Sequence, residues 1–222
     1  MNLRRNGGPL LRIGHRGAAR LAPANTLESI DAALAVGIDG VELDVLGVGG
    51  RVVLAHSARE LAPEPVTLDD ALELLAERAP EVLVIVDMKA SGPAFERDLV
   101  GVLRRHDAIP RTLAASGSPA VLRRTRDLEP ALATSLTYPR GRFFALKRLV
   151  LPFRIAGLLE AAGASATTLR HQVISEAVVD RCHELGIPVL AWTVNRPGVL
   201  ARLDALGVDG VITDDPRVFS AT

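Results

Sequence analysis

The sequence predicts a (β/α)8 barrel, also called a TIM barrel. Apolar, β-branched runs alternate with Ala/Leu/Glu/Arg-rich helical stretches, eight such runs occur, and no linker interrupts them. The 222 residues are long enough for one such barrel. We therefore expect a single domain over residues 1–222, with its core at about 11–216. The count of eight favours a closed barrel over the alternative, a doubly wound open sheet.

The eight predicted strands are apolar runs bounded by turn residues. In chain order they are Leu11–Gly14, Gly40–Val45, Val82–Met88, Thr112–Ala115, Ala131–Leu136, Ala166–Leu169, Pro188–Thr193 and Gly210–Thr213. A short additional extended segment, Arg51–His56, follows the second strand. The helices predicted between strands are Thr26–Val36, Leu68–Ala79, Ala94–His106, Pro119–Leu128, Lys147–Ala162, Ser175–Leu185 and Pro197–Leu206. Two similar segments, AVGIDGVELD and ALGVDGVITD, indicate a repeated helix–turn–strand unit.

The composition excludes several classes of protein. The 26 basic and 26 acidic residues cancel and aromatic residues make up only 3%, so we expect no nucleic-acid partner. The one cysteine, Cys182, excludes an intramolecular disulfide and a cysteine-based zinc site. We find no signal peptide and no apolar run long enough to span a membrane, and therefore expect a cytoplasmic protein. The oligomeric state is left open.

Carboxylates stand at the ends of two predicted strands, where the active site of such a barrel lies. In VELDV, strand alternation places Glu42 and Asp44 on the inward face, with the apolar residues between them facing the helices. In VDMK, Asp87 and Lys89 share a face. Neighbouring buried carboxylates repel one another, and a divalent cation relieves this. We predict a Mg²⁺ or Ca²⁺ site at Glu42, Asp44 and Asp87; the alternative is a set of internal salt bridges.

Imidazoles and permanent cations stand at the other strand ends. The run LRIGHRG ends in His15 and Arg16, and RVVLAHS ends near His56. Two histidines can divide general acid and base catalysis near neutral pH. Arg16, Lys89 and the metal would neutralise the oxygens of a phosphate group. This set of groups suits phosphoryl transfer, and the division of acid and base between the histidines is left open.

Five segments taken together resemble the glycerophosphodiester phosphodiesterase family, in order and over nearly the whole chain. They are GHRGAARLAPANTLESI, GVELDV, VVLAHS, VDMK, and VLAWTVN with GVDGVITDDP. The resemblance implies a TIM barrel with a divalent metal that hydrolyses glycerophosphodiesters to glycerol 3-phosphate and an alcohol. It also implies roles for six residues: His15 and His56 as the acid/base pair, Glu42 and Asp44 as metal ligands, and Arg16 and Lys89 as phosphate contacts.

The sequence departs from the family pattern at several positions. Asp87 stands where the family usually has glutamate, Ala24 replaces a usual glutamate, and Ser57 replaces a common aspartate. The insertion that usually follows the second histidine is reduced to about Ala58–Val66. We expect this short connection to leave the mouth of the barrel more open and to admit a bulkier diester.

Several other residues near strand ends are candidates for the site. Trp192 lies near the end of the seventh strand and is expected to pack against the glycerol or alkyl part of the substrate, with Asn195 nearby as a polar contact, although a structural tryptophan fits equally well. Asp214 and Asp215 are interpreted first as the cap of a short last helix, with a role in the site as the alternative. His171 follows the sixth strand and is a weaker candidate for the mouth.

The segment Arg140–Arg154 carries three of the five phenylalanines and five cations. We interpret it as the fifth loop and helix, with Phe143 and Phe144 as apolar cover and Pro152 kinking or ending the helix. Alternatively, it makes weak contact with an anionic membrane surface.

Two other functions compete with the predicted hydrolysis of small phosphodiesters. A lysophospholipase-D-like hydrolase acting on lysophospholipids is favoured by the short insertion and by the basic, phenylalanine-rich segment. A non-catalytic barrel that binds a phosphorylated ligand is disfavoured, because both histidines and all three carboxylates are present.

Overall fold

Eight parallel strands form a closed ring in the computed structural model, which describes residues 3–139 and 144–221. They are β1 (Leu11–His15), β2 (Gly40–Val48), β4 (Leu83–Met88), β5 (Thr112–Ser116), β6 (Ala133–Tyr138), β7 (Ala166–Arg170), β8 (Val189–Trp192) and β9 (Gly210–Thr213). β1 pairs in parallel with both β2 and β9, which closes the ring. β3 (Arg51–Leu54) pairs antiparallel with β2 outside the ring. The predicted barrel is confirmed, and the open sheet is excluded.

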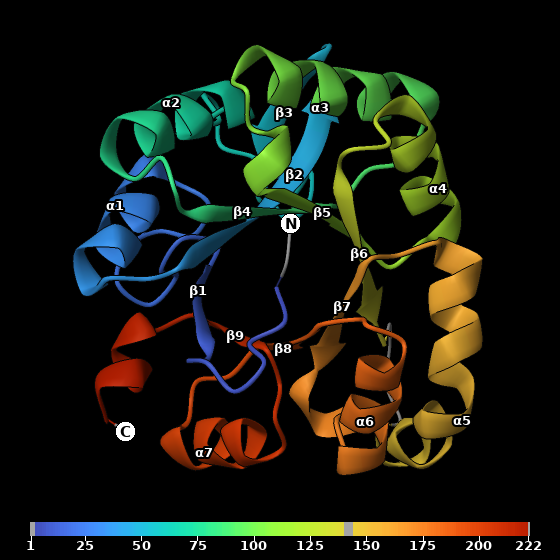
Figure 1. The fold of residues 1–222 in the computed structure, drawn as a ribbon. Helices are drawn as coiled ribbons and strands as arrows, with labels where there is room; N and C mark the ends of the chain where they lie inside the picture. The colour runs from blue at the N-terminus through green and yellow to red at the C-terminus, as the bar shows by residue number, and fades with distance from the viewer. Residues whose placement is uncertain (1–2, 140–143, 222) are drawn as a thin grey trace.

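Seven α-helices among the described residues surround the strands (Figure 1). They are α1 (Leu27–Val36), α2 (Leu68–Arg78), α3 (Pro93–Arg105), α4 (Pro119–Leu128), α5 (Phe144–Ala162), α6 (Glu176–Glu184) and α7 (Pro197–Ala205); the short 3-10 helices are η1 (Ile109–Arg111), η2 (His171–Val173) and η3 (Pro216–Ala221). Thr26 and Thr67 begin α1 and α2 through capping boxes. Proline occupies the first turn of α3, α4 and α7, where its missing N–H costs nothing.

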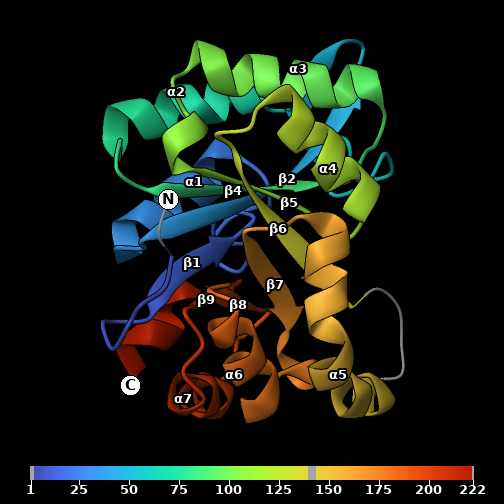
Figure 2. The same cartoon turned by 45° about the vertical axis from the view of Figure 1, so that its right-hand side comes forward.

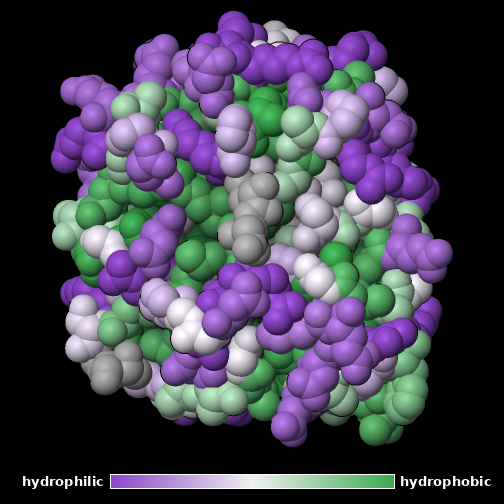
Figure 3. Space-filling model, in the orientation of Figure 1, coloured by the Kyte–Doolittle hydropathy of each residue, from purple (hydrophilic) through white to green (hydrophobic). Residues whose placement is uncertain are grey.

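Strand alternation divides the apolar side chains into two layers. Val41, Leu43 and Val45 of β2 pack outward against the helices, as predicted. A second cluster fills the inside of the ring and includes Ile13, Ile85, Leu113, Leu190 and Ile212. On the face seen in Figure 1, hydrophilic side chains lie along much of the periphery and also just below the centre (Figure 3). Inward-facing polar residues near the carboxyl ends of the strands therefore stand out against an apolar interior.

The helix α5 begins three residues before the predicted start at Lys147 and continues through Pro152 to Ala162. Pro152 does not end the helix, and the ribbon of α5 changes direction along its length (Figure 2). The first part of the predicted segment, residues 140–143, including Phe143, lies outside the described residues. Within residues 3–139 and 144–221, the structure contains no helix with both the length and the apolar character that crossing a membrane requires.

Asp209, before β9, ties the N-terminal segment to the barrel and is fully buried. Its Oδ1 accepts a hydrogen bond from the backbone N–H of Arg5 at 3.1 Å and lies 3.3 Å from Arg4 Nε. Its Oδ2 accepts from the backbone N–H of Val189 at 2.8 Å and lies 2.9 Å from His183 Nε2. We expect Asp209→Ala to lower the free energy of unfolding by about 3 kcal/mol, because it leaves buried donors without an acceptor.

Urea denaturation followed by circular dichroism measures this effect. The matched control is Asp204→Ala, since Asp204 forms an exposed ion pair with Arg5 and its loss is expected to cost less than about 1 kcal/mol. Equal stability losses in the two variants would contradict the role assigned to Asp209.

Candidate active site

A cavity of about 480 Å³ opens at the carboxyl ends of the barrel strands. Seven of the nine residues that the sequence predicts for the site line it: His15, Arg16, Glu42, His56, Asp87, Lys89 and Trp192. Asp44 is fully buried and pairs with Arg16 and Lys89 of the lining. The structure thus brings residues from β1, β2, β4, β8 and the loop after β3 to one place.

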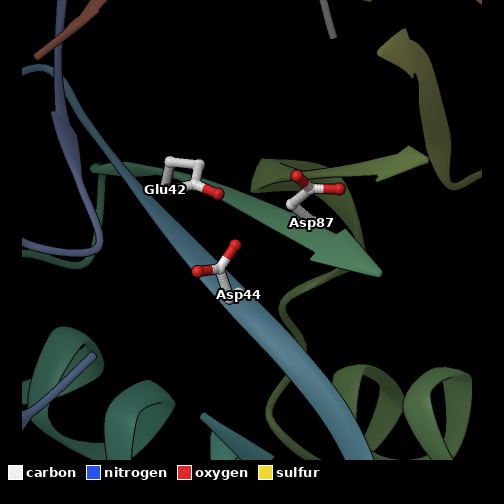
Figure 4. A group of neighbouring side chains, drawn as sticks. All are labelled: Glu42, Asp44 and Asp87. Atoms are coloured by element: carbon white, nitrogen blue, oxygen red, sulfur yellow. The ribbon is translucent and has the colours of Figure 1, made fainter. Parts of the chain in front are cut away.

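The carboxylates of Glu42, Asp44 and Asp87 form one cluster. Glu42 and Asp44 are two residues apart on β2, and Asp44 stands directly opposite Asp87 on β4 in the strand register. One oxygen of each carboxylate lies within 4.8 Å of the corresponding oxygens of the other two. Figure 4 shows the three side chains on the same side of these neighbouring strands. Strand alternation and a parallel register are sufficient to gather them.

Two cations and an amide hold Asp44 in place. Lys89 Nζ lies 2.9 Å from Asp44 Oδ1 and 2.5 Å from Asp87 Oδ2, and Arg16 Nε lies 2.8 Å from Asp44 Oδ2. Asn25 donates to Asp44 Oδ2 at 3.2 Å and accepts from the Asp44 backbone N–H at 3.1 Å. Burial alone would raise the pKa of Asp44, but the charges of Lys89 and Arg16 outweigh burial and lower it. Burial likewise opposes the charge on Lys89, yet Asp87 and Asp44 raise its pKa to about 12.

Glu42 indicates that the cluster suits a further positive charge. Burial raises the pKa of Glu42 to about 7, and the charges of Asp44 and Asp87 contribute, against the opposing effect of His15 and Lys89. The cations of the described chain therefore do not fully offset three ionised carboxylates. Three hard oxygen ligands of this kind suit a divalent cation such as Mg²⁺ or Ca²⁺. The residues present fit such an ion.

His15 is oriented by an acidic partner. Its Nδ1 lies 2.5 Å from Asp214 Oδ1, and its Nε2 lies 3.8 Å from Glu42 Oε2. Burial acts to lower the pKa of His15, but the nearby charge of Glu42 and the hydrogen bond and charge of Asp214 raise it. Asn195 fixes Asp214 in turn, donating to its Oδ2 at 2.5 Å and accepting from its backbone N–H at 2.9 Å. The side chain of Asn195 is thus engaged with Asp214 and is not part of the cavity lining among the described residues.

The interpretation of Asp214 as a helix cap is wrong, whereas that of Asp215 is correct. Asp215 starts η3: its carbonyl accepts from the Val218 N–H at 3.0 Å and its carboxylate from the Arg217 N–H at 3.2 Å. Asp214 contacts His15 across the closure of the ring, because β9 is the neighbour of β1. Its position at the carboxyl end of the last strand was the sequence signal that pointed to the site.

The turn after β1 explains the pattern HRG. Arg16 has φ of 52° and Gly17 has φ of 81°, a left-handed conformation that glycine adopts without strain. A Cβ atom on Gly17 would lie 2.3 Å from Ser29 Oγ, which donates a hydrogen bond to the carbonyl of Arg16. The backbone N–H of Arg16 donates to Glu42 Oε2 at 3.0 Å. This tight turn places the Arg16 guanidinium against Asp44 of the carboxylate cluster.

His56 lies at the edge of the cavity, and its side chain is 42% exposed. Its Nδ1 lies 3.3 Å from Glu60 Oε1, while Glu60 Oε2 lies 3.9 Å from Arg16 Nη1. Glu60 belongs to the short connection between β3 and α2. The sequence alone predicted no contact between this connection and the site residues. This connection therefore brings a carboxylate to the histidine.

The opposite wall contains an arginine that the sequence interpretation missed. Arg170, at the end of β7, lines the cavity with its guanidinium 4.5 Å from the ring centre of Phe144 and 5.5 Å from that of Trp192. The Trp192 indole N–H donates to the Thr168 carbonyl at 3.1 Å. His171, a weaker candidate from the sequence, does not line the cavity among the described residues. The location of Arg170 at a strand end was the available signal.

Comparison with known proteins agrees with this geometry. The sequence matches the glycerophosphoryl diester phosphodiesterase family over residues 15–62 and 50–218. It is 28% identical to a glycerophosphodiester phosphodiesterase of Caldanaerobacter subterraneus, with 94% of this chain and 96% of the relative aligned. It is 22% identical to the lysophospholipase D GDPD3 of Homo sapiens, over 94% of this chain and 84% of the relative.

Solved structures of other phosphodiesterases share this barrel fold. An Oleispira antarctica phosphodiesterase, solved in complex with the product sn-glycerol-3-phosphate, superposes with a TM-score of 0.81 at 23% identity, covering 96% of both chains. The family match and the structural superposition therefore both extend over nearly the whole barrel. The chain is a phosphodiesterase that belongs to the glycerophosphoryl diester phosphodiesterase family.

Proposed function

We propose that this protein hydrolyses glycerophosphodiesters to glycerol 3-phosphate and an alcohol, with a divalent metal ion as cofactor. The observation that carries the proposal is the cluster of Glu42, Asp44 and Asp87, whose oxygens lie within 4.8 Å of one another beside two histidines in one cavity. The name of the Caldanaerobacter relative and the product bound to the Oleispira protein support the same substrate class.

Glu42, Asp44 and Asp87 are the proposed ligands of Mg²⁺ or Ca²⁺. When bound, such an ion supplies electrostatic stabilisation of charge that develops on the phosphoryl oxygens. Lys89 and Arg16 lie beside the cluster and line the cavity, so they are placed to bind the remaining phosphate oxygens. Binding phosphate here requires both cations to share their charge between Asp44 and the substrate.

His15 and His56 are the proposed acid/base pair. One histidine removes a proton from the attacking nucleophile, either water or the substrate's own 2-hydroxyl, as its oxygen bonds to phosphorus, and the other protonates the alkoxide as the old P–O bond breaks. Attack by water gives glycerol 3-phosphate directly, whereas attack by the 2-hydroxyl gives a cyclic phosphate that water then opens to glycerol phosphate. Asp214 accepts a hydrogen bond from His15 Nδ1–H, which leaves Nε2 on the side of Glu42 and the cavity for proton transfer. His56, partly exposed at the cavity edge, can exchange its proton with solvent.

A hydrolysis screen tests this proposal. Protein dialysed against chelator is supplied with Mg²⁺, Ca²⁺ or Mn²⁺ and offered glycerophosphocholine, glycerophosphoethanolamine, glycerophosphoglycerol and lysophosphatidylcholine. We expect release of glycerol 3-phosphate from the glycerophosphodiesters with at least one ion. Turnover of no diester with any ion would overturn the proposal and favour a barrel that only binds a phosphorylated ligand.

A second candidate function is hydrolysis of lysophospholipids at a membrane surface. Its specific support is one face of α5: Leu146, Leu149 and Phe153 are 64%, 71% and 89% exposed. Their spacing of three and four residues places them on the same side of the helix. The neighbouring cations Lys147, Arg148 and Arg154 suit an anionic lipid surface. The name of the human relative, a lysophospholipase D, supports this candidate too.

We expect the double variant Leu149→Ser, Phe153→Ser to bind phosphatidylglycerol vesicles at least about tenfold more weakly than the wild type, because each buried methylene contributes about 0.8 kcal/mol. Vesicle co-sedimentation measures the binding, which added salt should weaken. The control is Leu185→Ser, which removes an exposed leucine at the end of α6. Equal binding by all three proteins, or no wild-type binding at low salt, would contradict a membrane contact through α5. The helix would then serve only to cover the barrel.

A cytoplasmic location is also proposed. Cys182 is a free, buried thiol, and burial raises its pKa to about 12. A single cysteine that is buried and forms no disulfide fits a reducing compartment.

A further inference from the structure

Arg170 places a positive charge on the wall opposite the carboxylate cluster. In the ring of eight strands, β7 is four places from β2 in either direction, so it lies across the barrel from Glu42 and Asp44. Alternation on β7 directs Ala166, Thr168 and Arg170 inward. Ala166 belongs to the interior apolar cluster, and Thr168 and Arg170 line the cavity.

Aromatic rings, and not carboxylates, hold the Arg170 side chain. Its guanidinium faces Phe144 at 4.5 Å and Trp192 at 5.5 Å, and its Nε donates to Gln172 Oε1 at 3.0 Å. Within residues 3–139 and 144–221, no carboxylate forms an ion pair with Arg170. Arg16, on the other wall, has Asp44 as its ion-pair partner. Arg170 is therefore a positioned cation whose charge is available to a ligand in the cavity.

This arrangement disfavours a cationic substituent. Aromatic faces in a cavity commonly attract a quaternary ammonium group, but here the faces of Phe144 and Trp192 already contact Arg170. A choline group on this wall would meet a like charge. Thr137 also lines this part of the cavity, and its Oγ1 has no hydrogen-bond partner among the described residues.

We propose that Arg170 binds an anionic group, a carboxylate or a phosphate, on the part of the substrate that extends away from the carboxylate cluster. The preferred substrates are then glycerophosphodiesters with a second negatively charged group. This inference rests on the proposed function and specifies its substrate class.

A matched pair of substrates tests it. Glycerophosphoserine differs from glycerophosphoethanolamine by one carboxylate. We expect kcat/KM of the wild type to favour glycerophosphoserine by about tenfold or more, as expected for a hydrogen bond between charged groups. Arg170→Gln should bring this ratio close to one. Arg170→Lys should retain part of it, because lysine keeps the charge but not the planar fork.

The control variant is Arg181→Gln, since Arg181 lies on the exposed face of α6 and pairs only with Glu184 among the described residues. It should keep the wild-type ratio. Raising the ionic strength should reduce the wild-type ratio, which tests the inference even if an Arg170 variant does not fold.

The outcomes separate the inference from the proposed function. Hydrolysis of both diesters with a wild-type ratio of one or less, or with a ratio that Arg170→Gln leaves unchanged, overturns the inference and leaves the proposed function standing. Hydrolysis of other glycerophosphodiesters but of neither member of this pair also overturns the inference alone. Hydrolysis of no diester with Mg²⁺, Ca²⁺ or Mn²⁺ overturns the proposed function, and the inference with it.

Discussion

Asp44→Asn is expected to reduce divalent-metal affinity by about 100-fold or more and turnover by about 10³-fold. Asp44 is the fully buried member of the carboxylate cluster and the one to which Lys89, Arg16 and Asn25 all bond. The amide has nearly the same shape, so the hydrogen bond that Asn25 accepts from the backbone of residue 44 is retained. The charge that would hold the metal is removed.

Isothermal titration calorimetry with Mg²⁺ and Ca²⁺ measures the affinity, and urea denaturation shows whether the variant remains folded. The matched control is Asp39→Asn, because Asp39 pairs with Arg12 at the start of β1, away from the cluster. If Asp44→Asn binds metal as tightly as the control, Asp44 does not belong to the metal site.

His15→Ala and His56→Ala are each expected to lower turnover by about 10² to 10⁴, as lost acid/base catalysts, while metal affinity is largely kept. The wild-type pH–rate profile should be bell-shaped, and each variant should lose one limb. The variant that loses the alkaline limb identifies the general acid, and the other identifies the general base. A monotonic wild-type profile with chemistry as the slow step would count against this division.

Asp214→Asn tests how His15 is positioned. Asparagine cannot accept the His15 N–H in the way the carboxylate does and changes which imidazole nitrogen carries the proton. We expect a loss of turnover that is no larger than that of His15→Ala, and no further loss in the combined variant, because the two residues act as a unit. Additive losses would mean that Asp214 acts independently of His15.

The architecture and the carboxylate cluster could be predicted from the sequence because both follow from short-range regularities. Apolar runs separated by helical stretches give the barrel, and a two-residue period places Glu42 and Asp44 on one face. Once the barrel is assumed, Asp87 must lie beside them, since β4 is the next strand of the ring.

The contacts of Asp214, Arg170 and Asn195 join residues far apart in the chain, and no local sequence pattern predicts them. Asp214 meets His15 only because the last strand closes against the first. Arg170 acquires its orientation from Phe144 and Trp192, which come from two other elements. Asn195 lies after β8, outside any strand, so alternation does not set the direction of its side chain, and it contacts Asp214.

The most direct test of the account is the metal dependence of phosphodiester hydrolysis. Protein dialysed against excess chelator is assayed with glycerophosphoglycerol, first without metal and then during titration with Mg²⁺ or Ca²⁺. The account predicts no release of glycerol 3-phosphate in chelator and restored release with at least one of the two ions. Full activity in excess chelator after dialysis would contradict it.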